Sequence, residues 1–421
     1  MIKSKTTAYF IKLIKTPAKG ILIILFIVFK VEAQIPGVLK PGNYNVAAYY
    51  HPMFHLEPRL KDFESKRILE WEKVKNARPR FPNHSQPKVP FWGYEDDSNP
   101  KVMEKKIKTA VEYGIGAFIF EFYWYNDSSL FEKCLKDGFL KSANVKDIKF
   151  ALMWTNHDWN EFELKSIWPA SFNSTVSPES FDKMTDHIIS AYFKQPNYWK
   201  INGCPYFSIY RIDKFIEGMG GRGNALRYLQ RFRMKVKREG FPDVHLNIIT
   251  RGLENINSEN GQTQPEELAA ILNFNSISSY SWLNDTYLGK FPVTPYDEVL
   301  QRVEMNWNKN AGKYKIPFYP NVTMGWDISP SSDLKSAYEF KSDMNCVLGE
   351  NTPSYFKVAL EKARKYLDDR KIKNKIILIN SWNNWSCGSY LEPDTVFKMD
   401  YLKTIKHIFK DNNEEEIFTE E

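Results

Sequence analysis

Three acidic residues stand where the chain leaves apolar segments, and their side chains could carry chemistry. Glu121 interrupts one apolar run, and Asp158 and Asp327 follow two others within a few residues. An unpaired charge is costly to bury, so each acid is expected either to take part in chemistry or to have a structural role. The structural alternative for Glu121 is an ion pair with Arg211 or Arg251, and for Asp158 it is to cap the segment that follows. Because a carboxylate can act as a general acid, a general base or a nucleophile, we predict Glu121, Asp158 and Asp327 as the catalytic residues.

Aromatic, amide and cationic side chains gather at the same positions. Sugars present apolar faces and a rim of hydroxyls, so their sites combine stacking rings with hydrogen-bonding groups. Any single Trp is more often packed in a core, and Glu392 could simply orient its loop, but the placement of the set favours a sugar site. Its predicted members are Tyr50, His51, Tyr123, Trp124, Trp154, His157, Arg211, Arg251, Tyr280, Trp282, Trp326, Trp382, Asn383, Asn384, Trp385 and Glu392.

Arg211 and Arg251 each follow an apolar run directly. A guanidinium group can bind a carboxylate, sulfate or phosphate through forked hydrogen bonds, or it can pair with a neighbouring acid such as Glu121 or Asp213. His157 has no second His at ligand spacing, and the four Cys residues show no metal-binding spacing. We therefore predict neither a metal site nor a cofactor.

Eight short apolar runs must position these residues, and segments of helical length separate them. The runs cover 45–50, 115–121, 148–154, 205–210, 244–250, 276–280, 316–323 and 375–380. Short apolar runs of this kind are typical of parallel strands covered on both faces. The alternation predicts an α/β fold, a single (β/α)8 TIM barrel, in which function collects on the loops that follow the strands. Helices are predicted over 99–113, 179–193, 225–239, 296–308 and 354–369, with Ser177, Thr294 and Thr352 as capping residues before Pro.

The loop after the first strand is the longest connection, at 51–99, and contains one helical piece near 65–76. Loops of this length in a compact domain are usually functional or disordered. Its aromatic residues Phe54, Phe81, Phe91, Trp92 and Tyr94 favour a lid packed on the mouth of the barrel or on a ligand, because exposing them all to water would be costly.

The N-terminus carries a basic segment, then the apolar run 21–29 and a small residue, Ala33. This pattern predicts a signal peptide at 1–33, and the run is too short to span a bilayer as a helix. The rest is predicted to be one domain at 34–411 and an acidic tail at 412–421. We expect a secreted or periplasmic protein without a stable membrane span after cleavage; an uncleaved anchor is the alternative.

The charge of the chain gives no support for a nucleic-acid partner. The net charge of +7 includes six Lys and one Glu in residues 1–33, so about +2 remains after cleavage. A surface that binds a polyanion should show clustered excess cation. We expect an oligosaccharide or polysaccharide as the partner, and no nucleic acid.

Several motifs resemble the family 99 glycoside hydrolases, which are endo-α-mannosidase-like, and the related WbsX-type glycosyltransferases. The matching segments are 46–52, 113–125, 150–159, 203–211, 325–330 and 382–394, in the family's order. The resemblance implies the same barrel and a carbohydrate substrate. It also implies two acid/base glutamates in Trp-Asn-Glu-Trp-x-Glu-Gly after the eighth strand, where this chain has Asn384 and Cys387. Neither an amide nor a thiol suits that role.

We therefore predict a glycoside hydrolase in which other carboxylates at the barrel mouth, led by Glu121, carry the chemistry. Two alternatives stay open. The barrel could bind a glycan without turnover, or it could transfer a sugar as the WbsX-type proteins are expected to do, although export would separate it from nucleotide-sugar donors.

Overall fold

The computed structural model describes residues 44–60, 69–157, 175–253, 265–332 and 345–410. All of them belong to one compact unit, Ile35–Glu421. The predicted signal peptide, Asp158 and the acidic tail lie outside the described residues, so these predictions remain as they stand. No helix within the described ranges has both the length and the apolar character needed to cross a membrane.

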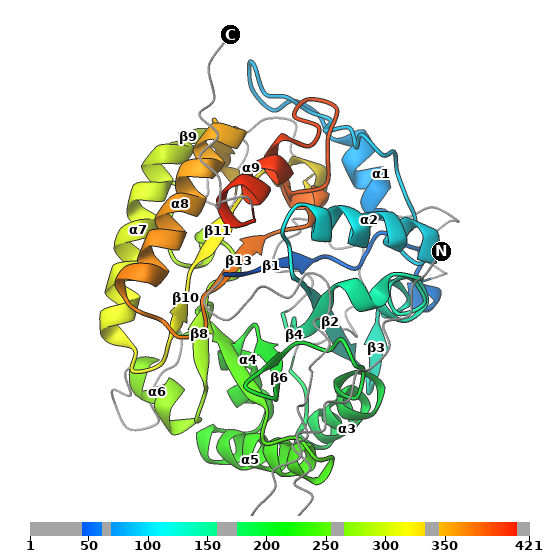
Figure 1. The fold of residues 1–421 in the computed structure, drawn as a ribbon, viewed down its shortest axis with the longest axis vertical. Coiled ribbons are helices and arrows are strands. Elements are labelled where there is room, and N and C mark those ends of the chain that lie inside the picture. The colour runs from blue at the N-terminus through cyan, green and yellow to red at the C-terminus, as the bar shows by residue number, and fades with distance from the viewer. Residues whose placement is uncertain (1–43, 61–68, 158–174, 254–264, 333–344, 411–421) are drawn as a thin grey trace, which may run out of the picture. The chain divides into compact units, whose positions relative to one another are not determined.

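Parallel strands form a barrel at the centre of this unit, with helices around it (Figure 1). Neighbouring strands follow the order of the chain, and β1 pairs in parallel with both β2 and β13. The TIM-barrel prediction is confirmed. The barrel strands are β1 (Asn45–Tyr50), β2 (Ala117–Tyr125), β4 (Lys149–Trp154), β6 (Cys204–Ile209), β7 (His245–Ile249), β8 (Ser276–Ser278), β10 (Phe318–Tyr319) with β11 (Asn321–Thr323), and β13 (Ile376–Asn380).

The seventh strand is interrupted at Pro320, which lies between β10 and β11. Proline has no N–H to donate, so a ladder cannot continue unbroken through it. β10 pairs with β8, and β11 pairs with β13. The two pieces together therefore connect the sixth barrel strand to the eighth and complete the ring.

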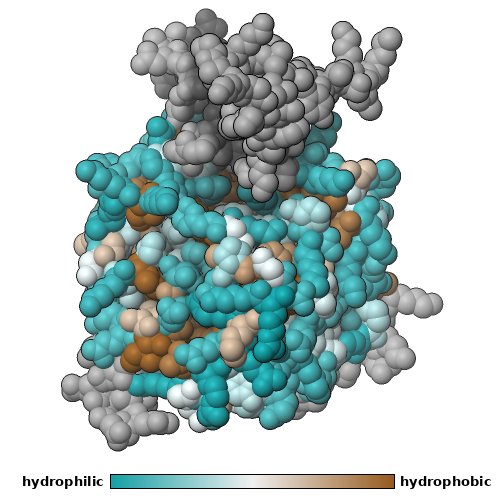
Figure 2. Space-filling view, turned by 60° about the horizontal axis from the view of Figure 1, so that its bottom comes forward, coloured by the Kyte–Doolittle hydropathy of each residue, from teal (hydrophilic) through white to brown (hydrophobic). Residues whose placement is uncertain are grey.

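The helices and the short strands lie outside the barrel wall. The helices are α1 (Leu69–Asn76), α2 (Pro100–Glu112), α3 (Pro178–Ile188), α4 (Ile212–Gly218), α5 (Arg222–Arg238), α6 (Pro265–Ile271), α7 (Tyr296–Lys313), α8 (Pro353–Asp369) and α9 (Asp400–Phe409). The short strands are β3 (Ser128–Leu130), β5 (Lys200–Ile201), β9 (Val293–Pro295), β12 (Val347–Gly349), β14 (Asn383–Asn384) and β15 (Ser389–Tyr390). One face of the unit is mostly hydrophilic, with apolar residues in separate areas (Figure 2).

Two of the three predicted helix caps are present. The side chain of Ser177 accepts a hydrogen bond from the backbone N–H of Ser180 at the start of α3, and Thr352 accepts one from Tyr355 at the start of α8. The prediction for Thr294 is wrong. Its hydroxyl bonds to the backbone of Lys290, because this residue lies in β9 and fixes the turn before that strand.

The lid after β1 is anchored by aromatic packing around α1. Phe54 and Trp71 have ring centroids 4.2 Å apart, and Trp71 also contacts Trp385 in the loop after β13. The expectation of burial is wrong for two of the lid's rings: Phe91 is 50% exposed and Tyr94 is 38% exposed. Lys75 lies over one face of Tyr94, which shields part of that ring without burying it.

Candidate active site

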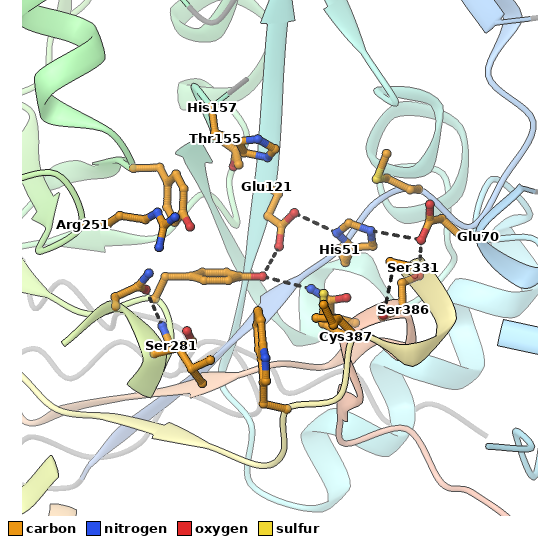
Figure 3. Close-up of a pocket in the computed structure, with 18 of the residues that line it drawn as sticks. His51, Glu70, Glu121, Thr155, His157, Arg251, Ser281, Ser331, Ser386 and Cys387 are labelled. Carbon is orange, nitrogen blue, oxygen red and sulfur yellow. Dashed lines mark hydrogen bonds and ion pairs between the residues drawn. The ribbon is translucent and has the colours of Figure 1, made fainter. Parts of the chain in front are cut away.

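A pocket opens at the carboxyl ends of the barrel strands, and residues from both ends of the chain line it (Figure 3). It encloses about 920 Å³ of space, its open mouth included. Eight of the predicted site residues line it: His51, Glu121, Tyr123, His157, Arg251, Tyr280, Trp326 and Asn384. The strand ends thus gather a carboxylate, two imidazoles, a guanidinium group and several rings around one hollow.

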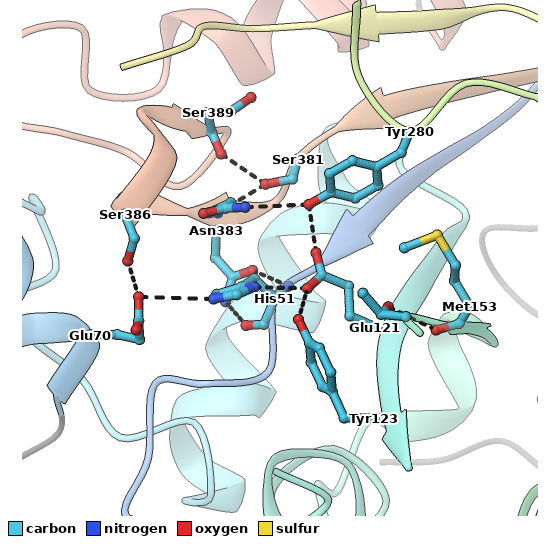
Figure 4. A network of polar contacts seen from close by, with 12 residues as sticks. His51, Glu70, Glu121, Tyr123, Met153, Tyr280, Ser381, Asn383, Ser386 and Ser389 are labelled. Carbon is cyan, nitrogen blue, oxygen red and sulfur yellow. Dashed lines mark hydrogen bonds and ion pairs between the residues drawn. The ribbon is translucent and has the colours of Figure 1, made fainter. Parts of the chain in front are cut away.

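Glu121 lies at the centre of a polar network in this pocket (Figure 4). Its Oε2 contacts His51 Nδ1 at 2.8 Å and accepts a hydrogen bond from the Tyr123 hydroxyl at 2.5 Å. Its Oε1 accepts one from the Tyr280 hydroxyl at 2.6 Å. Burial would raise the pKa of Glu121, but the charge of His51 and these three hydrogen bonds hold it below its ordinary value. The carboxylate is therefore ionised at neutral pH.

Glu70 approaches His51 from the other side. It belongs to α1 in the lid, and its Oε2 lies 4.0 Å from His51 Nε2. Lys73 and Ser386 donate hydrogen bonds to the Glu70 carboxylate. Burial would raise the pKa of Glu70, yet the charges of Lys73 and His51 lower it overall. The imidazole of His51 thus stands between two ionised carboxylates (Figure 3).

The backbone of His51 is held by a side chain from the opposite end of the sequence. Asn383 accepts a hydrogen bond from the N–H of His51 at 2.7 Å and donates one to its carbonyl at 2.8 Å. Asn383 also donates to Asp97, which Lys106 binds at 2.5 Å together with Glu392. Burial and the charge of Glu392 raise the pKa of Asp97 to about 6, although Lys106 opposes this. Asn383 therefore positions His51 without lining the pocket.

The alternation of side chains along the strands separates the pocket residues from the core residues. Glu121 and Tyr123 face the pocket, whereas Trp124 donates a hydrogen bond from its indole to Ser180 of α3. Trp154 packs on Phe181 and Phe215 of the surrounding helices. Successive residues of a strand point to opposite faces, so neither indole can reach a sugar in the pocket.

Six further residues predicted to bind sugar also pack away from the pocket, because they fill the layer between barrel and helices or hold loops together. Trp382 contacts Phe118 with ring centroids 5.1 Å apart, and Trp385 stacks on Tyr390 at 3.6 Å. Arg211 pairs with Asp213, the structural alternative of the sequence analysis. The six are Tyr50, Arg211, Trp282, Trp382, Trp385 and Glu392.

Asp327 does not line the pocket that contains Glu121. Its carboxylate accepts hydrogen bonds from Gln86 at 2.6 Å and from the Ser329 backbone at 3.0 Å, and it contacts His84 at 2.7 Å. It lines a second hollow, which shares Trp326 with the first pocket. Asp327 therefore fastens the lid to the loop after β11, and the expected pairing with Glu121 is absent from this arrangement.

The sequence analysis missed Glu70 and several other residues that line the pocket. Glu70 lies in the middle of the lid and follows no barrel strand, so the strand-end rule could not find it. Thr155 and Tyr210 do follow strands directly, after the paired strand ends Trp154 and Ile209. The other unpredicted lining residues are Met53, Lys73, Ser281, Leu283, Asn284, Ile328, Ser331, Ser386 and Cys387. No group of three or more His, Cys, Asp or Glu residues in the described ranges could hold a metal ion.

Comparison with known proteins assigns the chain to a family. A sequence model of the family described as glycosyltransferase WbsX matches residues 46–405. The chain belongs to the WbsX family. Two relatives, both named uncharacterized protein WxcX and both from strains of Xanthomonas campestris pv. campestris, are 24% identical over 365 residues, which is 83% of this chain and 47% of theirs. This WbsX-family chain therefore spans about half the length of the curated relatives it matches.

Two solved structures share the fold of this WbsX-family chain. One is described as a glycoside hydrolase-like protein, with a TM-score of 0.56, 14% identity, and coverage of 90% of this chain and 98% of the other. The second is the GH99 endo-alpha-mannosidase from Bacteroides thetaiotaomicron, with a TM-score of 0.51, 13% identity, and coverage of 86% and 95%. At such identities the likeness shows the fold alone. The family is described as a glycosyltransferase, and one of the two proteins that share the fold is described as an endo-alpha-mannosidase.

Proposed function

We propose that this protein hydrolyses a glycosidic bond of an oligosaccharide or polysaccharide, with Glu121 as its essential carboxylate. The observation that carries the proposal is the arrangement of Glu121, which lines the pocket and is fixed by His51, Tyr123 and Tyr280. A carboxylate offers about four acceptor sites, so these three partners leave about one for a ligand. Held in its ionised form, it suits the activation of water, or the stabilisation of positive charge at the anomeric carbon, and not proton donation.

The remaining lining residues support a sugar as the ligand. Asn384 is buried, and its Oδ1 has no hydrogen-bond partner among the described residues. A buried acceptor without a partner is costly, and a ligand hydroxyl would satisfy it. Its amide nitrogen lies 3.3 Å from the Tyr280 hydroxyl, and the rings of Tyr210 and Tyr280 meet nearby at right angles. Rings and amides of this kind match the apolar faces and hydroxyls of a sugar.

Replacement of Glu121 by Gln tests the proposal. Purified protein would be incubated with α-mannans and with host and plant glycans, and newly formed reducing ends would be measured. We expect wild-type turnover, a loss of about 10²–10⁴-fold in the Glu121→Gln variant, and glycan binding by both. Turnover that survives in the variant would reject the role of Glu121.

Glu132→Gln provides a matched control. Glu132 is also a carboxylate held by a histidine, a tyrosine and a serine, namely His187, Tyr192 and Ser129, but it does not line the pocket. We expect this variant to keep wild-type turnover. If both variants lose activity equally, the loss reflects folding and not chemistry at Glu121.

Sugar transfer is the second candidate function, and the family match favours it. The same incubations would include an acceptor glycan with and without a nucleotide-sugar donor. A product that forms only with the donor would replace hydrolysis by transfer. Glycan binding without any product would indicate a binding protein built on an enzyme fold.

We also propose that the protein is exported to the periplasm or secreted. The support is the basic segment followed by the apolar run 21–29 and Ala33. N-terminal sequencing of the protein from cell fractions tests this directly. A start at Gln34 in the exported fraction is expected, and an intact N-terminus in the cytoplasmic fraction would overturn the proposal.

A further inference from the structure

A gap between His51 and Glu70 forms part of the pocket wall. His51 Nδ1 is occupied by Glu121 at 2.8 Å, whereas Nε2 has no hydrogen-bond partner among the described residues. The 4.0 Å between Nε2 and Glu70 Oε2 exceeds the length of a hydrogen bond. An oxygen atom of a ligand placed beside this gap would come within hydrogen-bonding reach of both groups.

The charges around His51 favour its protonated form. Burial alone would lower the pKa of His51, but the charge and hydrogen bond of Glu121, followed by the charge of Glu70, raise it above its ordinary value, while Lys73 opposes them. The groups that face the ring are Glu121 and Tyr123 from β2, and Glu70 and Lys73 from α1. A raised pKa favours the imidazolium form, in which both ring nitrogens carry protons and the proton on Nε2 is directed toward the gap.

We propose that His51 is the proton donor of the reaction and that Glu70 orients the oxygen that receives the proton. This inference rests on the proposed hydrolysis. As the bond between the anomeric carbon and the glycosidic oxygen breaks, its electron pair stays on that oxygen, which takes the Nε2 proton. Water attacks the anomeric carbon and loses a proton to Glu121. Release of that proton to solvent and uptake of another by His51 restore the site.

The positions of these groups fit this division of roles. The imidazole ring lies between the carboxylates of Glu121 and Glu70, so one acid holds Nδ1 of the donor and the other faces its Nε2. Glu121 serves the donor in a second way, because it fixes the ring orientation and stabilises the imidazolium.

Substrates that differ in leaving group test the proposal. Departure of a sugar hydroxyl needs a proton, whereas departure of an acidic phenol from an aryl glycoside does not. For His51→Gln, we expect kcat on the glycan to fall by about 10²–10⁴-fold and kcat on the aryl glycoside to fall far less. The alkaline limb of the pH profile of kcat should disappear in this variant. For Glu70→Gln, that limb should move to lower pH, because a charge that raises the pKa of His51 is lost.

His187→Gln is the matched control, because His187 pairs with Glu132 outside the pocket and should leave the ratio of the two activities unchanged. An equal fall of both activities in His51→Gln would assign His51 a structural role, and a retained alkaline limb would exclude it as the donor. Either result with an active wild type overturns this inference alone. An inactive wild type on both substrates instead overturns the proposed hydrolysis.

Discussion

Replacement of Lys106 by Met should show how strongly the buried ion pairs of Lys106 with Asp97 and Glu392 support the fold. The side chain of Lys106 is 1% exposed, and its ammonium group lies 2.5 Å from Asp97 and 2.5 Å from Glu392. Burial would lower its pKa, but the two carboxylates raise it above its ordinary value, so the group is charged. In the Met variant, two carboxylates would remain close together without their cation. Loss of one partner of a buried ion pair costs about 3–5 kcal/mol.

The pH dependence of this loss makes the prediction specific. The pKa of Asp97, about 6 in the intact cluster, should rise further without Lys106. A carboxyl group whose pKa is raised by folding binds more protons in the folded state, so its contribution to stability falls as pH rises from its unfolded value through its folded one. Between pH 7.5 and pH 5.5, Asp97 of the variant would therefore become protonated, and part of the lost stability should return.

Urea unfolding at these two pH values, followed by tryptophan fluorescence, would measure the effect. We expect a loss of about 3–5 kcal/mol at pH 7.5 and a clearly smaller loss at pH 5.5. Lys101→Met on the same helix is the control, because Lys101 pairs with Glu104 at an exposed site and its replacement should leave stability unchanged. A loss below about 1 kcal/mol, or an equal loss at both pH values, would refute the reasoning.

Three more perturbations test other parts of the structure. Asn383→Ala leaves the buried N–H of His51 without its hydrogen-bond partner. We expect the free energy of unfolding, measured in urea, to fall by about 1–3 kcal/mol, and kcat to fall while glycan binding is retained. An unchanged kcat would exclude a positioning role for Asn383. Burial would raise the pKa of Asp327, but the hydrogen bond and the charge of His84 lower it. The stabilisation that Asp327 gives is therefore present above its unfolded pKa and disappears as pH falls, so Asp327→Asn should flatten the acid side of a plot of stability against pH, and an unchanged slope would contradict this. A Cβ at Gly325 would lie 2.4 Å from the carbonyl oxygen of Gly388. Gly325→Ala should therefore lower the free energy of unfolding by about 1–3 kcal/mol and lower the midpoint of thermal unfolding. An unshifted midpoint would contradict the close approach of the two backbones.

The strands could be predicted because buried parallel strands leave a clear local signal. Each barrel strand is a short, mostly apolar run, and the structure places it within a few residues of the predicted range. Helix caps could be predicted less reliably from the sequence. Ser177, Thr294 and Thr352 all precede Pro, yet Thr294 lies in a strand. There, pairing of β9 with β12 decided the conformation, and a distant segment cannot be detected in a tripeptide.

The site was only partly predictable, for two physical reasons. A strand end exposes every second residue to the pocket, so Glu121 and Tyr123 line it whereas Trp124 does not. The rule that function follows the strands takes no account of this parity. Glu70 reaches the pocket because Trp71 beside it packs on Phe54 and Trp385, and such long-range packing leaves no periodic signal in the sequence.

The parallel pairing of β1 with β13 has a consequence for how the protein is made. His51 is synthesised early. Two of the elements that hold this region, the strand β13 that pairs with β1 and the side chain of Asn383 that binds the backbone of His51, come more than 300 residues later. A chain that ends before β13 lacks both the strand that pairs with this edge of β1 and the amide that holds the backbone of His51. The proposed activity should therefore arise only when the final strand docks, and chains that end before β13 should lack it.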